Sequence, residues 1–287
     1  MKGIRFLILY CSILLAYSTC QAVGHAKTNQ NPTSPQEQCP MLSITTINVD
    51  HDCGAYQGYR SGFYAVVDFP MGKTTVESAI KAWVNNRLNP WKETPYTGDI
   101  NDATAMLQHY SANCKKVNGS PQIEAELRAQ NDGQEPQYNN DTTNTWFRMF
   151  FIKKEFENDH IVSYSVGWCA YDVGNATSSA NCTDCTFDKH TGQQLSWEMF
   201  KKKKAVQKLI RQALIEKFGD DANPTGEGVP MPQAPLFLKD GVRFDYGNYT
   251  VGEAHYYESH EEFPSCFIPY KKLLPLLTLK ASKLLKL

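Results

Sequence analysis

The sequence predicts an α+β fold in which helices pack on a largely antiparallel sheet, arranged as two small subdomains. Strand-like segments come in pairs joined by short turns, which is typical of antiparallel hairpins. Helical periodicity is confined to a few separate stretches, and the 287 residues are 41% hydrophobic and 21% charged, an ordinary globular composition. We expect one subdomain over residues 41–130 and the second over 145–287, separated by a polar stretch rich in Asn, Asp, Gln and Thr.

The first 22 residues have the features of an export signal peptide, in which basic residues precede a short apolar run and small polar residues follow. Residues 23–40 are poor in aliphatic side chains and predict a flexible lead-in. Cleavage after Ala22 would release a soluble protein, whereas acylation of Cys20 would make a lipid-anchored one. Both alternatives place the protein outside the cytoplasmic membrane, in the periplasm or at the cell surface.

In the first half, residues 63–69 carry apolar side chains on both faces of a strand, which predicts a central position in the sheet. Thr74 and Glu77 have the spacing of a capping box, and the helix that they begin ends before Pro90. The expected elements of this half are strands at 42–49 and 63–69 and helices at 74–89 and 102–117.

The second half opens with two aromatic strands, and the charged residues 153–159 between them predict a hairpin loop. A long helix follows a lysine run, with Gly219 placed as its C-cap. Asp240 and Gly241 predict a tight hairpin turn. The expected elements of this half are strands at 146–152, 160–171, 236–238, 242–244 and 266–268, a helix before Gly219, and an amphipathic last helix.

Seven cysteines remain after the signal peptide, and in an oxidising compartment they are disulfide candidates first. The number is odd, so at most three bridges can form. The favoured pairings are Cys39 with Cys53, and Cys169 with either Cys182 or Cys185. The Cys182 and Cys185 spacing also occurs in metal and redox sites, but it appears once only, which favours a structural disulfide.

Three segments in the second half carry a resemblance to a known family. They are Thr186 to Leu195 (TFDKHTGQQL), Phe237 to Phe244 (FLKDGVRF) and Ile268 to Leu273 (IPYKKL). With the aromatic strands before them, they resemble the extracellular domain of RsiV-like proteins, a family of unknown function that also occurs beside PdaC-type polysaccharide deacetylases. The segment from Tyr64 to Trp83 resembles the small domain that precedes it.

The resemblance implies a protein or cell-wall ligand, because the anti-sigma member of the family binds lysozyme with its outside domain. This chain opens on an export signal in place of a cytoplasmic anti-sigma segment, so we do not expect it to control a sigma factor. Residues 174–177 keep only part of the Gly, Ala and His run usual in the family loop.

One polar segment stands out as a candidate binding surface. Tyrosines are good binding anchors, and histidines and carboxylates can bind metal or exchange protons. Its two histidines lie five residues apart, whereas helical zinc ligands lie three or four apart, so we expect no metal and no cofactor. A polar surface loop is the alternative interpretation. The candidate residues are His255, Tyr256, Tyr257, Glu258 and His260.

The sequence therefore predicts an exported cell-envelope binding module without catalysis. It has no His-Glu-x-x-His, Gly-x-Ser-x-Gly or phosphate-loop motif, and its 29 basic against 30 acidic residues exclude an ordinary nucleic-acid binder. We expect membrane contact only through a lipid on Cys20. One alternative is an envelope enzyme acting on glycan or peptide through residues 255–262, and another is a structural lipoprotein that contacts a second envelope protein.

Overall fold

The computed structural model describes residues 39–56, 59–90, 92, 94–112, 145–171, 179–219, 230–247 and 264–287. Residues from Cys39 to Leu287 belong to one compact unit. Its strands are β1 (Ile44–Tyr56), β2 (Tyr59–Pro70), β3 (Thr145–Glu157), β4 (Ile161–Tyr171), β5 (Ser179–Cys182), β6 (Cys185–Asp188), β7 (Gln194–Leu195), β8 (Pro235–Phe237), β9 (Gly241–Asp245) and β10 (Ser265–Pro269). Its helices are α2 (Thr75–Arg87), α3 (Ala103–Ala112), η1 (Trp197–Met199), α5 (Lys203–Phe218), α7 (Tyr270–Leu273), η3 (Leu274–Leu276) and α8 (Leu279–Leu285).

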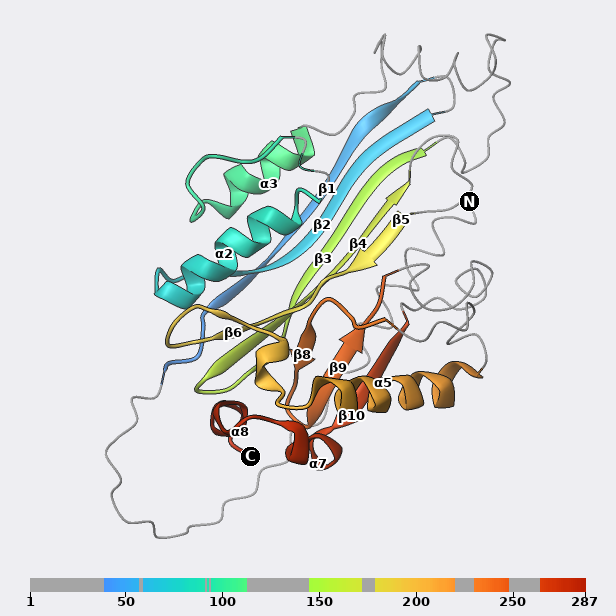
Figure 1. Cartoon of the computed structure of the whole chain (residues 1–287). Coiled ribbons are helices and arrows are strands. Elements are labelled where there is room, and N and C mark those ends of the chain that lie inside the picture. Colours follow the sequence, from blue (N-terminus) through green and yellow to red (C-terminus); the bar gives the residue numbers. More distant parts are fainter. Residues whose placement is uncertain are drawn as a thin grey trace, which may run out of the picture. The chain divides into compact units, whose positions relative to one another are not determined.

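The strands form two sheets, as the α+β prediction requires. Seven strands make the larger sheet in the order β1-β2-β3-β4-β6-β7, with β5 also paired to β4, and β10-β9-β8 make the smaller one. Every pair is antiparallel except β2 with β3, which is parallel. This parallel pair joins the two halves of the chain, so both predicted subdomains contribute strands to one sheet (Figure 1).

The predicted central strand is confirmed, since β2 lies between β1 and β3. Its side chains at Phe63, Ala65, Val67 and Phe69 alternate onto one face, where all four are buried. Helices α2 and α3 cover that face and complete the first hydrophobic core (Figure 1).

The capping box at the start of α2 is also confirmed. The Glu77 backbone N–H donates to the Thr74 hydroxyl, and the Glu77 carboxylate accepts from the Thr74 backbone N–H. Burial opposes the charge of Glu77, but hydrogen bonds from Thr74 and from the Gly72 backbone outweigh it and lower the pKa of Glu77.

A second core lies between α5, the smaller sheet and the C-terminal helices. Helix α5 buries Val206, Ile210 and Leu214 at helical spacing and ends at Gly219, whose φ of 61° makes it the predicted glycine C-cap. The Asp240-Gly241 hairpin is confirmed as the connection between β8 and β9. A Cβ on Gly241 would lie 2.5 Å from the Ile268 carbonyl oxygen, so β9 and β10 approach too closely there for any side chain.

Buried hydroxyl groups join the two sheets. Ser163 on β4 donates to the Phe237 carbonyl oxygen of β8 at 2.5 Å, and the Phe237 N–H donates to Thr186 on β6 at 3.2 Å. Ser163 and Thr186 also lie 2.9 Å apart, oxygen to oxygen. Because these groups are buried and satisfied, they fix the smaller sheet against β4 and β6.

The predicted hairpin loop at residues 153–159 is wrong for most of its length, because β3 continues to Glu157. Both the backbone and the charged side chains of this stretch have partners in the fold. The Lys154 backbone N–H donates to Asp68 at 3.0 Å, and the Glu157 carboxylate accepts from the Leu42 N–H at 2.8 Å. A β-bulge between Lys154 and Phe156 leaves Glu155 out of the ladder.

The single last helix is also replaced by three short pieces. Helix α7 gives way to η3 at Leu274, Pro275 cannot continue an α-helix, and Thr278 caps the new helix α8 by accepting from the Ala281 N–H. Among the helices within the described ranges, none has the length and apolar character needed to cross a membrane.

The predicted pairing of Cys39 with Cys53 does not fit this fold. Cys39 precedes β1, and Cys53 lies nine residues beyond Ile44, the first residue of that strand. At about 3.3 Å per residue the strand separates Ile44 from Cys53 by about 30 Å. The five residues from Cys39 to Ile44 reach at most about 18 Å, so Cys39 cannot come within the roughly 7 Å between Cα atoms that a disulfide needs. Cys39 instead contacts His190.

Candidate functional site

The predicted binding surface, residues His255 to His260, lies outside the described residues, as does the loop at 174–177. The described chain stops at Gly247, two residues after β9 ends. Gly247 packs against Asn181 of β5, because a Cβ placed on Gly247 would lie 2.5 Å from the Asn181 side-chain oxygen. The Tyr246 N–H also donates to the Pro264 carbonyl oxygen at 2.9 Å, so the residues on either side of 248–263 lie next to each other.

Four charged residues gather beside this point, and we call them the carboxyl cluster: Glu155, Asp184, Arg243 and Asp245. Glu155 lies in the bulge of β3, and Asp184 lies in the two-residue connection between β5 and β6. Arg243 and Asp245 are two residues apart on β9, so they point to the same side of that strand. The cluster therefore contains residues from both sheets.

Arg243 connects the acidic groups. Its Nε donates to Asp245 Oδ2 at 2.8 Å, and its Nη1 lies 3.8 Å from Glu155 Oε1 across the two sheets. Glu155 also accepts a hydrogen bond of 2.7 Å from the Ser165 hydroxyl. Burial disfavours the charged guanidinium, but Asp245, then Asp184 and Glu155, outweigh it and raise the pKa of Arg243.

Asp184 is the unusual member of the cluster. It is 5% exposed, and both of its carboxylate oxygens are buried with no hydrogen-bond donor among the described residues. Burial, followed by the like charge of Asp245, raises the pKa of Asp184 well above its usual range, while Arg243 acts in the opposite direction.

A proton on Asp184 accounts for these observations. Asp245 Oδ1 is a second buried acceptor that has no donor in the described part of the chain, and Asp184 is the group positioned to hydrogen-bond with it. Two carboxylates that share a buried site cannot both ionise without a large cost. The raised pKa favours the protonated form of Asp184, and a protonated Asp184 would donate its O–H to Asp245, which in turn pairs with Arg243.

The cysteines on either side of Asp184 are thiols. Cys182 and Cys185 are both buried, and neither forms a disulfide in this structure. Burial raises the pKa of Cys185, and burial followed by the nearby Asp245 and Asp184 raises the pKa of Cys182. Since the thiolate is the reactive form, burial at this position disfavours nucleophilic chemistry at both thiols.

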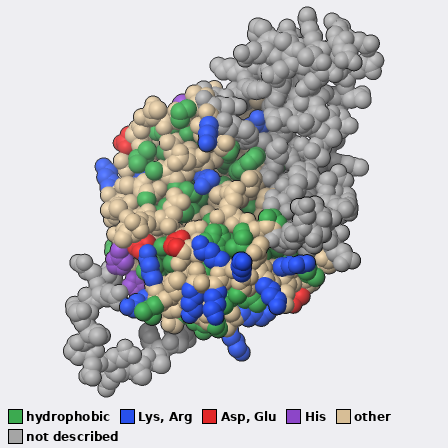
Figure 2. Space-filling model, in the orientation of Figure 1, with side chains coloured by type: hydrophobic (Ala, Val, Ile, Leu, Met, Phe, Trp, Pro, Cys, Tyr) green, Lys and Arg blue, Asp and Glu red, His purple; other side chains and the backbone are tan. Residues whose placement is uncertain are grey.

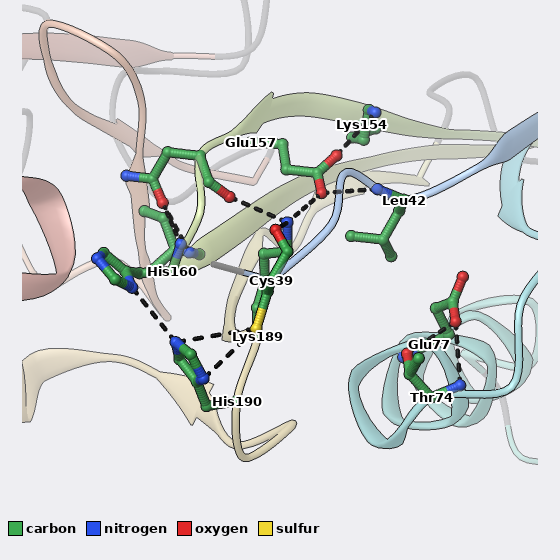
Figure 3. A network of polar contacts seen from close by, with 11 residues as sticks. Cys39, Leu42, Thr74, Glu77, Lys154, Glu157, His160, Lys189 and His190 are labelled. Carbon is green, nitrogen blue, oxygen red and sulfur yellow. Dashed lines mark hydrogen bonds and ion pairs between the residues drawn. The ribbon is translucent and has the colours of Figure 1, made fainter. Parts of the chain in front are cut away.

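Another polar network lies where the residues before β1 meet the β3–β4 hairpin (Figure 3). At its centre, Lys189 Nζ lies 2.6 Å from Glu157 Oε1, and both side chains are only 1% exposed. Lys154 also contacts Glu157, at 3.1 Å. Lys189 further donates to the carbonyl oxygens of Asn158 and Cys39, so the buried ammonium has several acceptors.

A thiol and two imidazoles continue this network. Cys39 Sγ lies 3.4 Å from His190 Nδ1, and His190 Nε2 lies 3.3 Å from His160 Nδ1 (Figure 3). Burial, then the positive charges of Lys286 and His190, lower the pKa of His160. Thiol and imidazole are zinc and copper ligands, but within the described ranges no group of three or more metal-ligating side chains has the geometry to hold a metal ion.

The sequence analysis predicts neither the carboxyl cluster nor the network around Lys189. The Arg243-x-Asp245 spacing on a strand places opposite charges on one face, and this pattern alone would have predicted an ion pair there. Nothing in the sequence indicated that Asp184 and Glu155 would join them, because each comes from an irregular point, a turn and a bulge.

Comparisons with known proteins identify the fold. No protein-family model matches this chain, and no curated protein matches it significantly. A solved DUF3298 family member from Bacteroides fragilis superposes with a TM-score of 0.65 at 12% identity, covering 86% of this chain and 98% of its own. A DUF3298 family protein from Pseudomonas aeruginosa superposes with a TM-score of 0.54 at 15% identity, covering 84% and 97%. The chain has the fold of these DUF3298 proteins, an uncharacterised family.

Proposed function

We propose that this protein is an exported binding module of the cell envelope, that residues His255 to His260 are its contact surface, and that a lysozyme-like protein is its ligand. One observation carries the proposal: the carboxyl cluster includes Asp245, which precedes His255 by ten residues in the sequence. Buried groups with strongly shifted pKa values gather at functional sites more often than elsewhere. The RsiV-like resemblance supplies lysozyme as the first ligand to test.

Charge complementarity supports a basic ligand. The residues that follow the two tyrosines include Glu258, Glu261 and Glu262. Carboxylates around aromatic anchors are suited to a basic protein partner, because opposite charges favour encounter while buried aromatic side chains supply most of the affinity. The carboxyl cluster would hold the end of β9, ten residues before His255.

The burial of the carboxyl cluster favours binding over catalysis. A catalytic acid must come within hydrogen-bonding distance of its substrate, whereas both oxygens of Asp184 are enclosed. We therefore assign Asp184 to positioning and not to chemistry. An envelope enzyme acting on glycan or peptide is the second candidate, because a carboxyl pair that shares a proton is also an arrangement used for acid–base catalysis.

Titration calorimetry of the exported chain against lysozyme tests the proposal, with an unrelated protein of similar net positive charge as the control. Saturable binding to lysozyme alone is the expected result. The double variant Tyr256→Ala, Tyr257→Ala should bind at least tenfold more weakly, since anchors of this kind contribute about 2 kcal/mol or more. The matched variant His190→Ala, an exposed residue of another loop, should bind as the parent does.

Two results would contradict the proposal. Equal heat with lysozyme and with the control protein would mean that charge alone drives association. Turnover of peptidoglycan fragments that is lost on His255→Ala, His260→Ala with the fold intact would favour the enzyme in place of the binding module.

A further inference from the structure

One surface of the molecule is strongly basic although the chain as a whole is nearly neutral. Residues 201–218 carry seven Lys and Arg side chains against one acidic residue, Glu216, and residues 270–287 carry five Lys and no acidic residue. The net charge of the full chain is −1. The positive charge is therefore concentrated in α5, α7, α8 and the residues beside them.

These side chains share a region of the surface. The start of α5 lies against the C-terminal segment, because the Lys201 N–H donates to the Leu276 carbonyl oxygen and the Thr278 N–H donates to that of Met199. In Figure 2 the blue side chains gather over the part of the molecule where Figure 1 places α5, α7 and α8. The exposed members, which we call the basic face, are Lys201, Lys202, Lys203, Lys204, Lys208, Arg211, Lys217, Lys271, Lys272, Lys280, Lys283 and Lys286.

Exposed apolar side chains lie among these lysines. The described residues include seven large hydrophobic side chains that are exposed, and five of them belong to α5, β10 and the C-terminal segment: Ile215, Phe267, Leu274, Leu279 and Leu287. Leu279 is 73% exposed and lies one turn from Lys283 on α8. Lysines and exposed leucines therefore occupy the same short helix.

We propose that the basic face docks on the surface of an anionic lipid bilayer. Lysines attract acidic headgroups while the exposed leucines enter the boundary between headgroups and acyl chains, which is how amphipathic helices bind membrane interfaces. A soluble polyanion would engage the lysines alone and leave the leucines in water. The exposed leucines therefore favour lipid over nucleic acid or an acidic polysaccharide.

Vesicle co-sedimentation tests this docking directly. The probe is the protein from residue 23 to residue 287, which lacks Cys20 so that no lipid anchor can contribute, mixed with vesicles of equal parts phosphatidylglycerol and phosphatidylcholine. We expect binding to these vesicles, little binding to pure phosphatidylcholine, and a strong loss between 0.1 and 0.5 M salt, because screening shortens the reach of the lysines.

Two variants and one control separate the contributions. Lys280→Gln with Lys283→Gln should weaken binding about 30-fold, at about fivefold per basic residue near the membrane. Leu274→Ser with Leu279→Ser should weaken it about tenfold, because less apolar surface enters the interface. The control, Lys73→Gln with Lys92→Gln, removes the same charge from exposed positions outside the basic face and should bind as the parent does.

The outcomes are distinct. Equal loss in the Lys280, Lys283 variant and in its control would overturn the basic face as the docking surface. Loss in the lysine variant with no change in the leucine variant would overturn lipid as the partner and indicate a soluble polyanion. Thermal unfolding of each variant shows that the fold is retained.

Discussion

Replacing Asp184 with Asn is expected to stabilise the protein at neutral pH. Burial, then the charge of Asp245, raise the pKa of Asp184 in the folded protein, whereas an unfolded aspartate titrates near pH 4. Above that pH the folded protein must hold a proton that the unfolded chain releases. An asparagine at this position cannot ionise, and its amide N–H can still donate to Asp245 Oδ1, the acceptor that lacks a donor among the described residues.

The size of the effect follows from the number of protons bound. Between the unfolded and the raised folded pKa of Asp184, the folded state binds one proton more than the unfolded state. The free energy of unfolding therefore falls by about 1.4 kcal/mol for each pH unit in this range. The Asp184→Asn variant lacks this slope, so its advantage over the parent should grow with pH over the range in which only the folded state keeps the proton.

Urea unfolding followed by circular dichroism at pH 5, 6 and 7 measures this difference. The matched control is Asp240→Asn, which removes the same charge from an exposed hairpin turn where Asn-Gly is as suitable as Asp-Gly. The control should follow the pH dependence of the parent. Parallel curves for the parent and the Asp184 variant would refute the reasoning, because they would mean that Asp184 is ionised in the folded protein.

Three further substitutions test the fold by urea or thermal unfolding. Lys189→Met leaves Glu157 buried without its nearest cation and should cost about 3 kcal/mol; a loss below about 1 kcal/mol would show that Lys154 alone can balance the charge. Gly241→Ala places a Cβ against the backbone of β10 and should cost about 2 kcal/mol through overpacking, so an unchanged midpoint would contradict the close approach of β9 and β10. Thr74→Ala removes the α2 cap and should cost about 1 kcal/mol, whereas Thr75→Ala, next to it on the exposed first turn, should cost less than half as much.

The elements that the sequence predicts well are those whose signals are local. The capping box at Thr74, the alternation of residues 63–69 and the glycine after α5 each depend on neighbours within a few residues, and all three are confirmed. The hairpin at Asp240 and Gly241 belongs to the same class, since its turn chemistry lies within two residues.

The charged stretch from Lys153 to Glu157 could not be assigned in this way. Five residues with several charges predict a loop, because isolated charges prefer solvent. In the fold, Lys189 comes from 32 positions further along the chain to pair with Glu157, and Asp68 accepts from the Lys154 backbone. The partners that permit a strand here are brought together only by the sheet.

The carboxyl cluster was unpredictable for the same reason. Asp184 lies between two cysteines whose spacing indicates disulfide or metal chemistry. Its actual environment depends on β9 and on the bulge of β3, which lie far from it in the sequence. The shift in the pKa of Asp184 arises from burial first, and burial of a short polar connection is a property of the packed sheets and not of its own sequence.

The net charge of the whole chain and the charge near one of its surfaces have different consequences for binding. A sum of 29 basic and 30 acidic residues excludes the excess that an ordinary nucleic-acid binder shows. This sum does not describe the electrostatic potential near α5 and α8. A bilayer surface interacts mainly with charges that lie within a Debye length of it, about 8 Å at physiological salt. Along residues 201–218 and 270–287, which carry the basic face, twelve basic side chains stand against one acidic side chain, Glu216. A nearly neutral chain can therefore bind an anionic membrane while acidic residues elsewhere on it remain available to a basic protein, and raising the salt concentration should weaken both contacts.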